Sequence, residues 1–265
     1  MTRLAHLTWP QAATRAGAGQ LLAVPVGATE QHGPHLPLST DTDVAVAIAE
    51  ALAERRDDLL VAPPVAYGSS GEHQDFAGTL SIGQEAVELL LVELGRSASG
   101  SFPRLLLVSA HGGNAEPVAR AVARLRREGR DVLAWSPHWD GDAHAGRTET
   151  SLMLWLAPRR VRLELAQAGS VLPLGELLPR LRREGVRAAS PSGVLGDPAG
   201  ASAEDGERLL RGAVEELAAA VAAWAGPPEG SGEPHDGPAG GRSGPVPPTG
   251  AGEPEGGAPV RADPQ

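Results

Sequence analysis

Short apolar runs alternate with helical periodicity along most of the chain, and this alternation constrains the fold more than any other feature. Strand-like runs occur at residues 21–26, 59–62, 104–109 and 131–136. The run at 104–109 is continuous in Leu and Val, as expected of a strand buried on both faces. Alternating strands and helices predict a mostly parallel sheet with helices on both of its faces.

Helices are expected between and after these strands. The apolar spacing predicts them at residues 43–56, 84–97, 114–128, 148–156 and 203–224. Asp41 or Thr42 is expected to lie near the cap of the first helix. Ligands of such folds bind at the carboxyl ends of the strands, so polar motifs at those ends are the first candidates for a functional site.

The segment 226–265 has a different composition from the rest of the chain. About half of its residues are Gly or Pro, and large apolar side chains are nearly absent. Such a segment buries too little apolar surface to offset the entropy cost of ordering, so we expect a disordered tail. Residues 1–225 are long enough to form one domain with a sizeable core.

Composition excludes several classes of function. The formal net charge is −10, which argues against a nucleic-acid binder. The chain has no cysteine, so thiol nucleophiles, cysteine-ligated zinc and disulfides are excluded. Neither a signal-peptide pattern nor an apolar run near 18 residues is present, so we expect a cytoplasmic protein without a membrane span. Arginines cluster at 124–130, 159–162 and 180–187, and we interpret them as solvated helix faces, one of which could meet an anionic part of a substrate.

The loop after the first predicted strand carries the densest group of polar side chains. Within eighteen residues it contains Glu30, His32, His35, Asp41 and Asp43, set among glycines and prolines. Carboxylate oxygens and imidazole nitrogens brought together at a strand end are suited to a divalent metal. The alternative is a polar surface loop in which Asp41 only caps the next helix.

A second motif follows the third predicted strand, where His111-Gly-Gly-Asn114 leads into a helix. Gly112 and Gly113 permit a close approach of the backbone to a ligand. The N–H groups at the helix start could stabilise an oxyanion. The alternative is a tight strand-to-helix turn with a hydrogen-bonded histidine.

Two further segments carry candidate residues. His144 and Glu149 flank a loop-to-helix junction, where Glu149 is either a functional carboxylate or a favourable charge in the first helical turn. Trp139 belongs either to the core or to a pocket. Glu72 and His73 lie in a glycine-rich loop that either faces a substrate or is a mobile polar loop. The sequence has no nucleophile-elbow serine motif, Walker motif or dinucleotide fingerprint.

Taken together and in order, these motifs resemble the creatininase family. The matching pattern consists of Glu30-x-His32-Gly-Pro-His35-Leu-Pro-Leu, Asp41, His111-Gly-Gly-Asn114, His144-Ala-Gly-x-x-Glu149-Thr-Ser and Gly193-Val-Leu-Gly-Asp197-Pro. The resemblance covers about residues 5–225. It implies a three-layer α/β/α sandwich, a metal-dependent amidohydrolase, a homo-oligomer and two divalent metals per subunit.

The resemblance also implies roles for individual residues. Metal ligands would be Glu30, His32, Asp41, His111 and Glu149, with Asp41 bridging the two ions. His144 would be the catalytic histidine, and Glu149 could share the acid–base role. Such ligands admit zinc, iron(II) or manganese, and the paired ions would activate a water for attack on an amide.

The chain departs from this family at one position. Creatininase carries a metal-binding glutamate two residues after the histidine of its third-strand loop, and Gly113 stands there in this chain. The second metal's acidic ligand must then come from elsewhere, and Glu149 is the candidate. This departure counts against creatinine itself as the substrate.

Within the family, the loop at 68–74 and the helix at 149–155 resemble those of a peptidase that acts on a modified, ribosomally made precursor peptide. That likeness implies hydrolysis near the C-terminus of the peptide, with release of a Val-Tyr-derived unit. We expect substrate contacts from Glu72, His73, Gly112, Gly113 and Trp139. The alternatives are a hydrolase of a small cyclic amide or formamide, and a non-catalytic metal-binding scaffold.

Overall fold

The computed structural model describes residues 3–226, so the predicted tail lies outside the described residues apart from Gly226. The described sheet has four strands in the order β2-β1-β3-β4, and every neighbouring pair is parallel. The strands are β1 (Leu21–Val26), β2 (Leu59–Val61), β3 (Arg104–Ser109) and β4 (Asp131–Trp135). The predicted parallel sheet is confirmed, and each predicted strand is present within one residue of its expected bounds.

Successive residues of the central strand β1 serve two different cores. Leu21 and Ala23 belong to one buried apolar cluster, and Leu22 and Val24 belong to another. Side chains of a strand alternate between the two faces of its sheet, so a continuous apolar run requires a cover on both sides. The two clusters therefore lie on opposite faces of the sheet.

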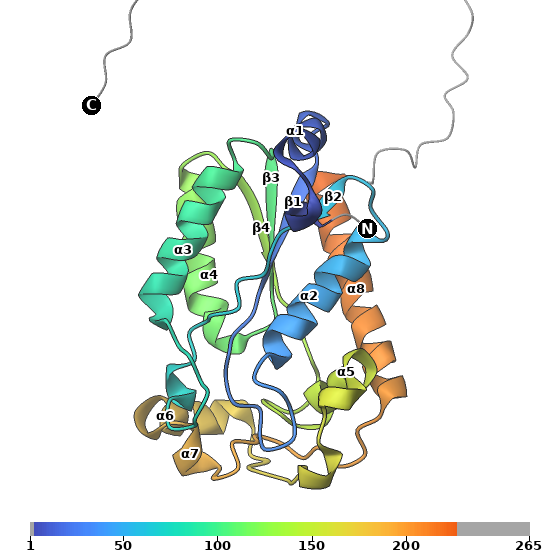
Figure 1. Ribbon diagram of the computed structural model, residues 1–265. Helices are drawn as coiled ribbons and strands as arrows, with labels where there is room; N and C mark the ends of the chain where they lie inside the picture. The colour runs from blue at the N-terminus through green and yellow to red at the C-terminus, as the bar shows by residue number, and fades with distance from the viewer. Residues whose placement is uncertain (1–2, 227–265) are drawn as a thin grey trace, which may run out of the picture. The chain divides into compact units, whose positions relative to one another are not determined.

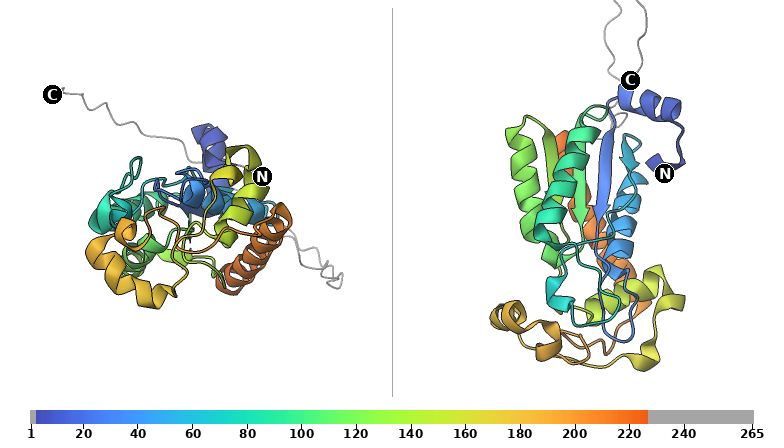
Figure 2. Two further views of the ribbon diagram at one scale, coloured as in Figure 1. Left: turned by 90° about the horizontal axis from the view of Figure 1, so that it is seen from below. Right: turned by 60° about the vertical axis from the view of Figure 1, so that its left-hand side comes forward.

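Helices cover both faces, which confirms the α/β/α sandwich. One face packs against α2 (Thr40–Ala53), α5 (Arg147–Leu156) and α8 (Ala203–Ala225). The other packs against α3 (Gly83–Ala98) and α4 (Ala115–Arg127). Figures 1 and 2 show these two helical layers with the sheet between them. None of the described helices combines the length and apolarity needed to cross a membrane.

Helix α2 begins at Thr40, three residues earlier than predicted. Ser39 occupies the N-cap position, and Asp41 lies inside the first turn. Asp41 and Thr42 therefore lie near the cap, as expected, although the helix begins earlier. As a consequence, the helix itself holds Asp41 at the carboxyl end of the sheet, where a first-turn carboxylate is favoured by the helix dipole.

The sequence pattern did not predict helices α1 (Trp9–Gly17), α6 (Leu174–Glu184) and α7 (Val186–Ala189). Helix α1 buries none of its residues, and a capping box between Thr8 and Gln11 supports its start. Helix α6 buries only Leu177 and Leu181. Both α6 and α7 contact the 3₁₀ turn Gly71–His73, at the end of the molecule where the strands finish (Figure 1).

Candidate metal centre

Glu30, Asp41 and His111 form the centre of a buried polar cluster. Glu30 follows β1, Asp41 lies in the first turn of α2, and His111 follows β3. The His111 ring lies between the two carboxylates, with Nδ1 3.2 Å from Asp41 Oδ2 and Nε2 3.4 Å from Glu30 Oε2. Each residue offers a ligand atom within 4.8 Å of the others, which is a spacing that one metal ion can span.

A second possible metal site adjoins the first and contains His32, His144 and Glu149. His32 Nε2 lies 3.3 Å from Asp41 Oδ1 and 3.9 Å from Glu149 Oε2. The two oxygens of Asp41 thus face different histidines, His32 and His111. This is the placement expected of a carboxylate that bridges two ions.

His73 completes a third group with Glu30 and His144. Its Nε2 lies 3.6 Å from Glu30 Oε1, and His144 Nδ1 lies at the same distance from that oxygen. His73 belongs to a loop expected to contact substrate, yet the residue is only 5 % exposed. The 3₁₀ turn Gly71–His73 carries the ring inward, and no local pattern in the sequence indicates that.

The polar atoms of the cluster fit a metal centre. Glu30 Oε2 and Asp41 Oδ2 are buried and have no hydrogen-bond partner. Leaving a buried carboxylate oxygen without a partner is costly, so such atoms are usually matched to a ligand. Oxygen and imidazole donors without any thiolate suit zinc, manganese or iron(II).

The electrostatics of the metal-free cluster point the same way. Burial raises the pKa of Glu30 to about 7 and also raises that of Glu149. Burial alone would lower the pKa of His32 and His111, but the neighbouring carboxylates outweigh it and raise each to about 10. The two imidazolium groups hold the pKa of Asp41 well below its usual range, against the effect of burial. Without metal the cluster therefore holds protons that a divalent cation would replace.

The backbone around His144 fixes the position of Glu149. Ala145 has φ of +53°, a left-handed conformation that is strained for a residue other than glycine. Its N–H donates a hydrogen bond of 2.5 Å to Glu149 Oε2. Glu149 therefore faces the cluster and does not act only as a favourable charge in its helix.

Asn114 ties together the loops that follow three strands. Its Nδ2 donates to Gly27 O at 2.9 Å, and its Oδ1 accepts from Ser69 N at 2.9 Å. Ser69 O in turn accepts a hydrogen bond from His111 Nε2 at 2.9 Å. From the sequence, Asn114 was predicted only to be the first residue of a helix. Its role in holding the site depends on residues far away in the chain.

Gly113 has a structural reason to be glycine. A Cβ at this position would collide with the carbonyl oxygen of Ser69 and with the His111 ring. The glutamate that creatininase carries there has no room in this arrangement. Besides Asp41, Glu149 is the described carboxylate that lies within 4 Å of the His32 ring.

The cluster opens into a cavity of about 680 Å³, which Glu30, His73, His111 and His144 help to line. The expected substrate-contacting residues Glu72, Gly112 and Gly113 also lie on its wall. Helix α6 supplies another part of the wall through a stripe four residues apart, Leu174, Leu178 and Arg182. The arginine cluster at 180–187 thus does reach the cavity.

Three other sequence candidates lie away from the cavity and the ligand atoms. Trp139 packs against the apolar core that contains α2, α5 and α8 and is not among the residues that line this cavity. His35 Nε2 pairs with Thr150 Oγ1 at 2.9 Å. Asp43 forms an ion pair of 2.8 Å with Arg160.

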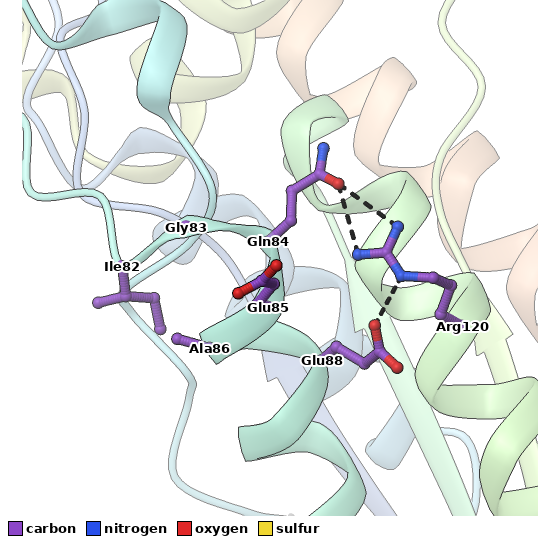
Figure 3. A pocket seen from close by; sticks show the side chains of 7 residues that line it. All are labelled: Ile82, Gly83, Gln84, Glu85, Ala86, Glu88 and Arg120. Atoms are coloured by element: carbon purple, nitrogen blue, oxygen red, sulfur yellow. Dashed lines mark hydrogen bonds and ion pairs between the residues drawn. The ribbon is translucent and has the colours of Figure 1, made fainter.

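A separate hollow at the start of α3 differs in character (Figure 3). Its charged groups satisfy one another, since Arg120 donates to Glu88 at 2.6 Å and to Gln84 at 3.4 Å. No histidine is among the residues that line it. The histidine cluster is therefore the better candidate for chemistry.

Comparison with known proteins agrees with this site. The family model described as "Creatininase: Creatinine amidohydrolase" matches residues 5–221. The chain belongs to the creatininase family. Membership makes it a metal-dependent hydrolase that acts on amide bonds, as the sequence motifs predicted.

Close relatives within the creatininase family have more specific names. The chain is 52 % identical over 211 residues to the mycofactocin precursor peptide peptidase of Mycolicibacterium smegmatis. The matched region covers 77 % of this chain and 85 % of that protein. It is 48 % identical over 233 residues to the protein of the same name from Mycobacterium ulcerans, covering 84 % and 89 %.

Solved creatininases share the fold. A manganese creatininase superposes with a TM-score of 0.74 at 27 % identity, covering 84 % of this chain and 98 % of that one. A mutant creatininase of the zinc–zinc type gives a TM-score of 0.72 at 27 % identity, covering 83 % and 96 %. Solved members of the family with this fold therefore include metal-bound forms.

Proposed function

We propose that this chain is a peptidase that hydrolyses an amide bond near the C-terminus of the modified mycofactocin precursor peptide and releases its Val-Tyr-derived unit. The observation that carries the proposal is the identity of about 50 % to proteins of that name over most of both chains. The cavity supports it, since about 680 Å³ is a volume typical of ligand sites and its α6 wall offers leucines to an apolar unit.

Two divalent ions are proposed as the cofactor, with zinc, manganese and iron(II) as the candidate metals. Glu30, Asp41 and His111 would hold one ion. Asp41, His32 and Glu149 would hold the other. Bound ions of this kind polarise an amide carbonyl and lower the pKa of water.

The chain's own groups would divide the remaining work. His144 moves a proton between the attacking water and the leaving amine. The N–H groups of Gly112 and Gly113 begin the 3₁₀ turn Gly112–Asn114, ahead of its first hydrogen bond, and are available to a developing oxyanion. Glu72 and the α6 stripe contact the peptide beyond the scissile bond. A homo-oligomer and a cytoplasmic location stay predictions from the sequence resemblance and composition.

A cleavage assay tests this proposal. Metal-loaded protein is incubated with the modified precursor peptide, and the products are followed by mass spectrometry. We expect loss of a C-terminal dipeptide-derived unit with the natural protein and none with Glu30→Gln. Glu93→Gln is the matched control, because Glu93 is an exposed carboxylate outside the cluster. Absence of cleavage by protein that has bound its metal would contradict the proposal and favour a small cyclic amide or formamide as substrate.

A further inference from the structure

Gln31 is a buried amide between two residues of the metal centre, and its side chain is not explained by metal binding. It is only 4 % exposed and lies next to Glu30 and His32 in the sequence. A buried amide must satisfy its donors and acceptor within the protein. The partners of Gln31 therefore show what it does.

Two backbone groups fix which way the amide faces. Gly33 N–H donates to Gln31 Oε1 at 2.8 Å, and Gln31 Nε2 donates to Gly193 O at 3.1 Å. A backbone N–H can only donate and a carbonyl can only accept, so the amide cannot be turned over. Gly193 has φ of +82°, and a Cβ there would collide with the Gln31 amide, so only glycine accommodates this contact.

The second amide hydrogen reaches His73. Gln31 Nε2 lies 2.8 Å from His73 Nδ1, which must accept the hydrogen bond. A neutral imidazole carries one proton, so the proton of His73 lies on Nε2. That N–H faces the cavity beside Glu30 Oε1, 3.6 Å away.

His144 is fixed by the main chain of the same residue. Its Nε2 lies 2.8 Å from Gln31 O, an atom that only accepts, so Nε2 carries the proton. The amide nitrogen of Gln31 is also 3.0 Å from His144 Nε2, but that contact joins two donors, and the amide hydrogen goes to His73. His144 therefore presents an unprotonated Nδ1 toward Glu30 Oε1.

We propose that Gln31 is a positioning residue that orients His73 and His144 oppositely, so that His73 offers an N–H to the reacting amide and His144 offers a proton acceptor. In the reaction, water oxygen bonds to the amide carbon while His144 Nδ1 takes a proton. The carbon–nitrogen bond then breaks, and His144 returns that proton to the leaving amine. His73 donates a hydrogen bond to the carbonyl oxygen throughout and is a further catalytic residue. This catalytic assignment rests on the proposed function, whereas the tautomers do not.

Nitrogen-15 NMR of the zinc-loaded protein, labelled at histidine, tests the tautomers without any substrate. In the natural protein we expect the proton on Nε2 of both His73 and His144. In Gln31→Met, His73 should shift toward a mixture of tautomers, because its donor is gone. His144 should keep its signals, because its partner is a main-chain carbonyl. A proton on Nδ1 of His73 in the natural protein, or an unchanged His73 in Gln31→Met, would overturn the inference.

Two further variants serve as a control and as a replacement if Gln31→Met does not fold. Gln20→Met is the matched control, because Gln20 is also buried and donates to a backbone carbonyl, Asp57 O at 3.0 Å, but lies outside the cavity wall. It should leave both histidine signals unchanged. If Gln31→Met does not fold, Gln31→Glu replaces the donor by an acceptor, and the proton of His73 should move to Nδ1. A His73 proton that stays on Nε2 in that variant contradicts the inference.

Kinetics on the precursor peptide test the catalytic part. Removing one hydrogen-bond donor to a developing oxyanion lowers kcat by roughly 10²–10³-fold, so we expect a loss of that order for His73→Phe with a small change in KM. Gln31→Met should lower kcat by about tenfold, because His73 then keeps the correct tautomer only part of the time. An equal kcat for His73→Phe and the natural protein would remove His73 from catalysis. Failure of the natural protein to cleave the peptide would reject the proposed function and leave the NMR result standing.

Discussion

Two groups of charged side chains in this molecule contain similar residues but differ in whether their charges are paired. At the surface, Arg96 donates to Glu128 at 2.5 Å and 3.0 Å and to Glu93 at 2.6 Å, and Glu128 also pairs with Arg130. Each charge there has a partner and reaches solvent. In the buried cluster, Glu30 and Asp41 each keep an oxygen without a hydrogen-bond partner.

The difference shows how a ligand site can be told from a structural ion network. A surface network that satisfies itself gains little from an added ion, since solvent already screens its charges. A buried cluster with unpartnered carboxylate oxygens is incomplete without a ligand.

Replacing Asp41, the proposed bridging carboxylate, should have the largest effect. Asp41→Asn removes the charge that faces both His32 and His111, so we expect metal content to fall below one ion per chain and hydrolysis to fall by about 10³-fold or more. Metal analysis by mass spectrometry and the cleavage assay measure both. Asp43→Asn, two residues away on the same helix, should retain metal, because Asp43 pairs with Arg160 instead. Full metal content in Asp41→Asn would contradict the bridging role.

Metal binding should release protons and strengthen with pH. In the metal-free protein the pKa values of His32 and His111 are raised to about 10, so both rings are protonated at neutral pH. Ligation needs the unprotonated rings, so affinity should rise by about tenfold per pH unit for each proton released, until the pH exceeds the raised pKa. Calorimetry of zinc binding in buffers with different ionisation enthalpies counts these protons. A binding enthalpy that does not depend on the buffer would show that none is released.

A side chain at Gly113 should destabilise the fold by a smaller but clear amount. Gly113→Ala places a methyl group against Ser69 O and the His111 ring, and overpacking of this kind costs about 1–3 kcal/mol. Denaturant unfolding of the metal-free protein measures the free energy. Gly112→Ala is the control for stability, since a Cβ there has no atom within 4 Å. Equal unfolding free energies for the two variants would show that the loop adapts to the methyl group.

Breaking the surface network should have the smallest effect. Glu128→Gln should leave metal content unchanged and lower the unfolding midpoint only slightly, and less at high salt. The Arg96 hydrogen bonds lower the pKa of Glu128 from 4.5 to about 2, so its contribution is present above pH 4.5 and lost as the pH falls toward 2. The difference between Glu128→Gln and the natural protein should therefore vanish over that range. A loss of metal in this variant would break the contrast between the two groups.

Much of the architecture was predictable because it follows from local patterns. Apolar runs such as 104–109 mark buried strands, and every predicted strand and helix is present with small shifts at its ends. Helix α1 was missed because it buries none of its residues and so belongs to no core pattern. Helix α6 was missed although Leu174, Leu177, Leu178 and Leu181 recur at a helical period, because Pro179 argues against a helix interior. The start of α2 was misplaced because the polar residues at 40–43 read equally as a cap or a first turn.

The candidate ligands were also visible in the sequence, because their types and spacing form motifs. Glu30, His32, Asp41, His111 and Glu149 do converge in one place. His73 lines the cavity but is more deeply buried than its glycine-rich loop suggests, and Trp139 packs against the apolar core. A glycine-rich loop and a partly apolar aromatic residue are compatible with several positions, so composition alone cannot choose among them.

The fold class, the family and the set of groups able to hold a metal can all be recognised in the sequence, since each depends on short segments of the chain. How those groups are used depends on contacts between distant segments. Gln31 meets His73, His144 and Gly193 across separations of 42, 113 and 162 residues. The steric need for glycine at 113 likewise comes from Ser69, a residue of a different loop. Contacts of this range are set by packing, and no local pattern of residues encodes them.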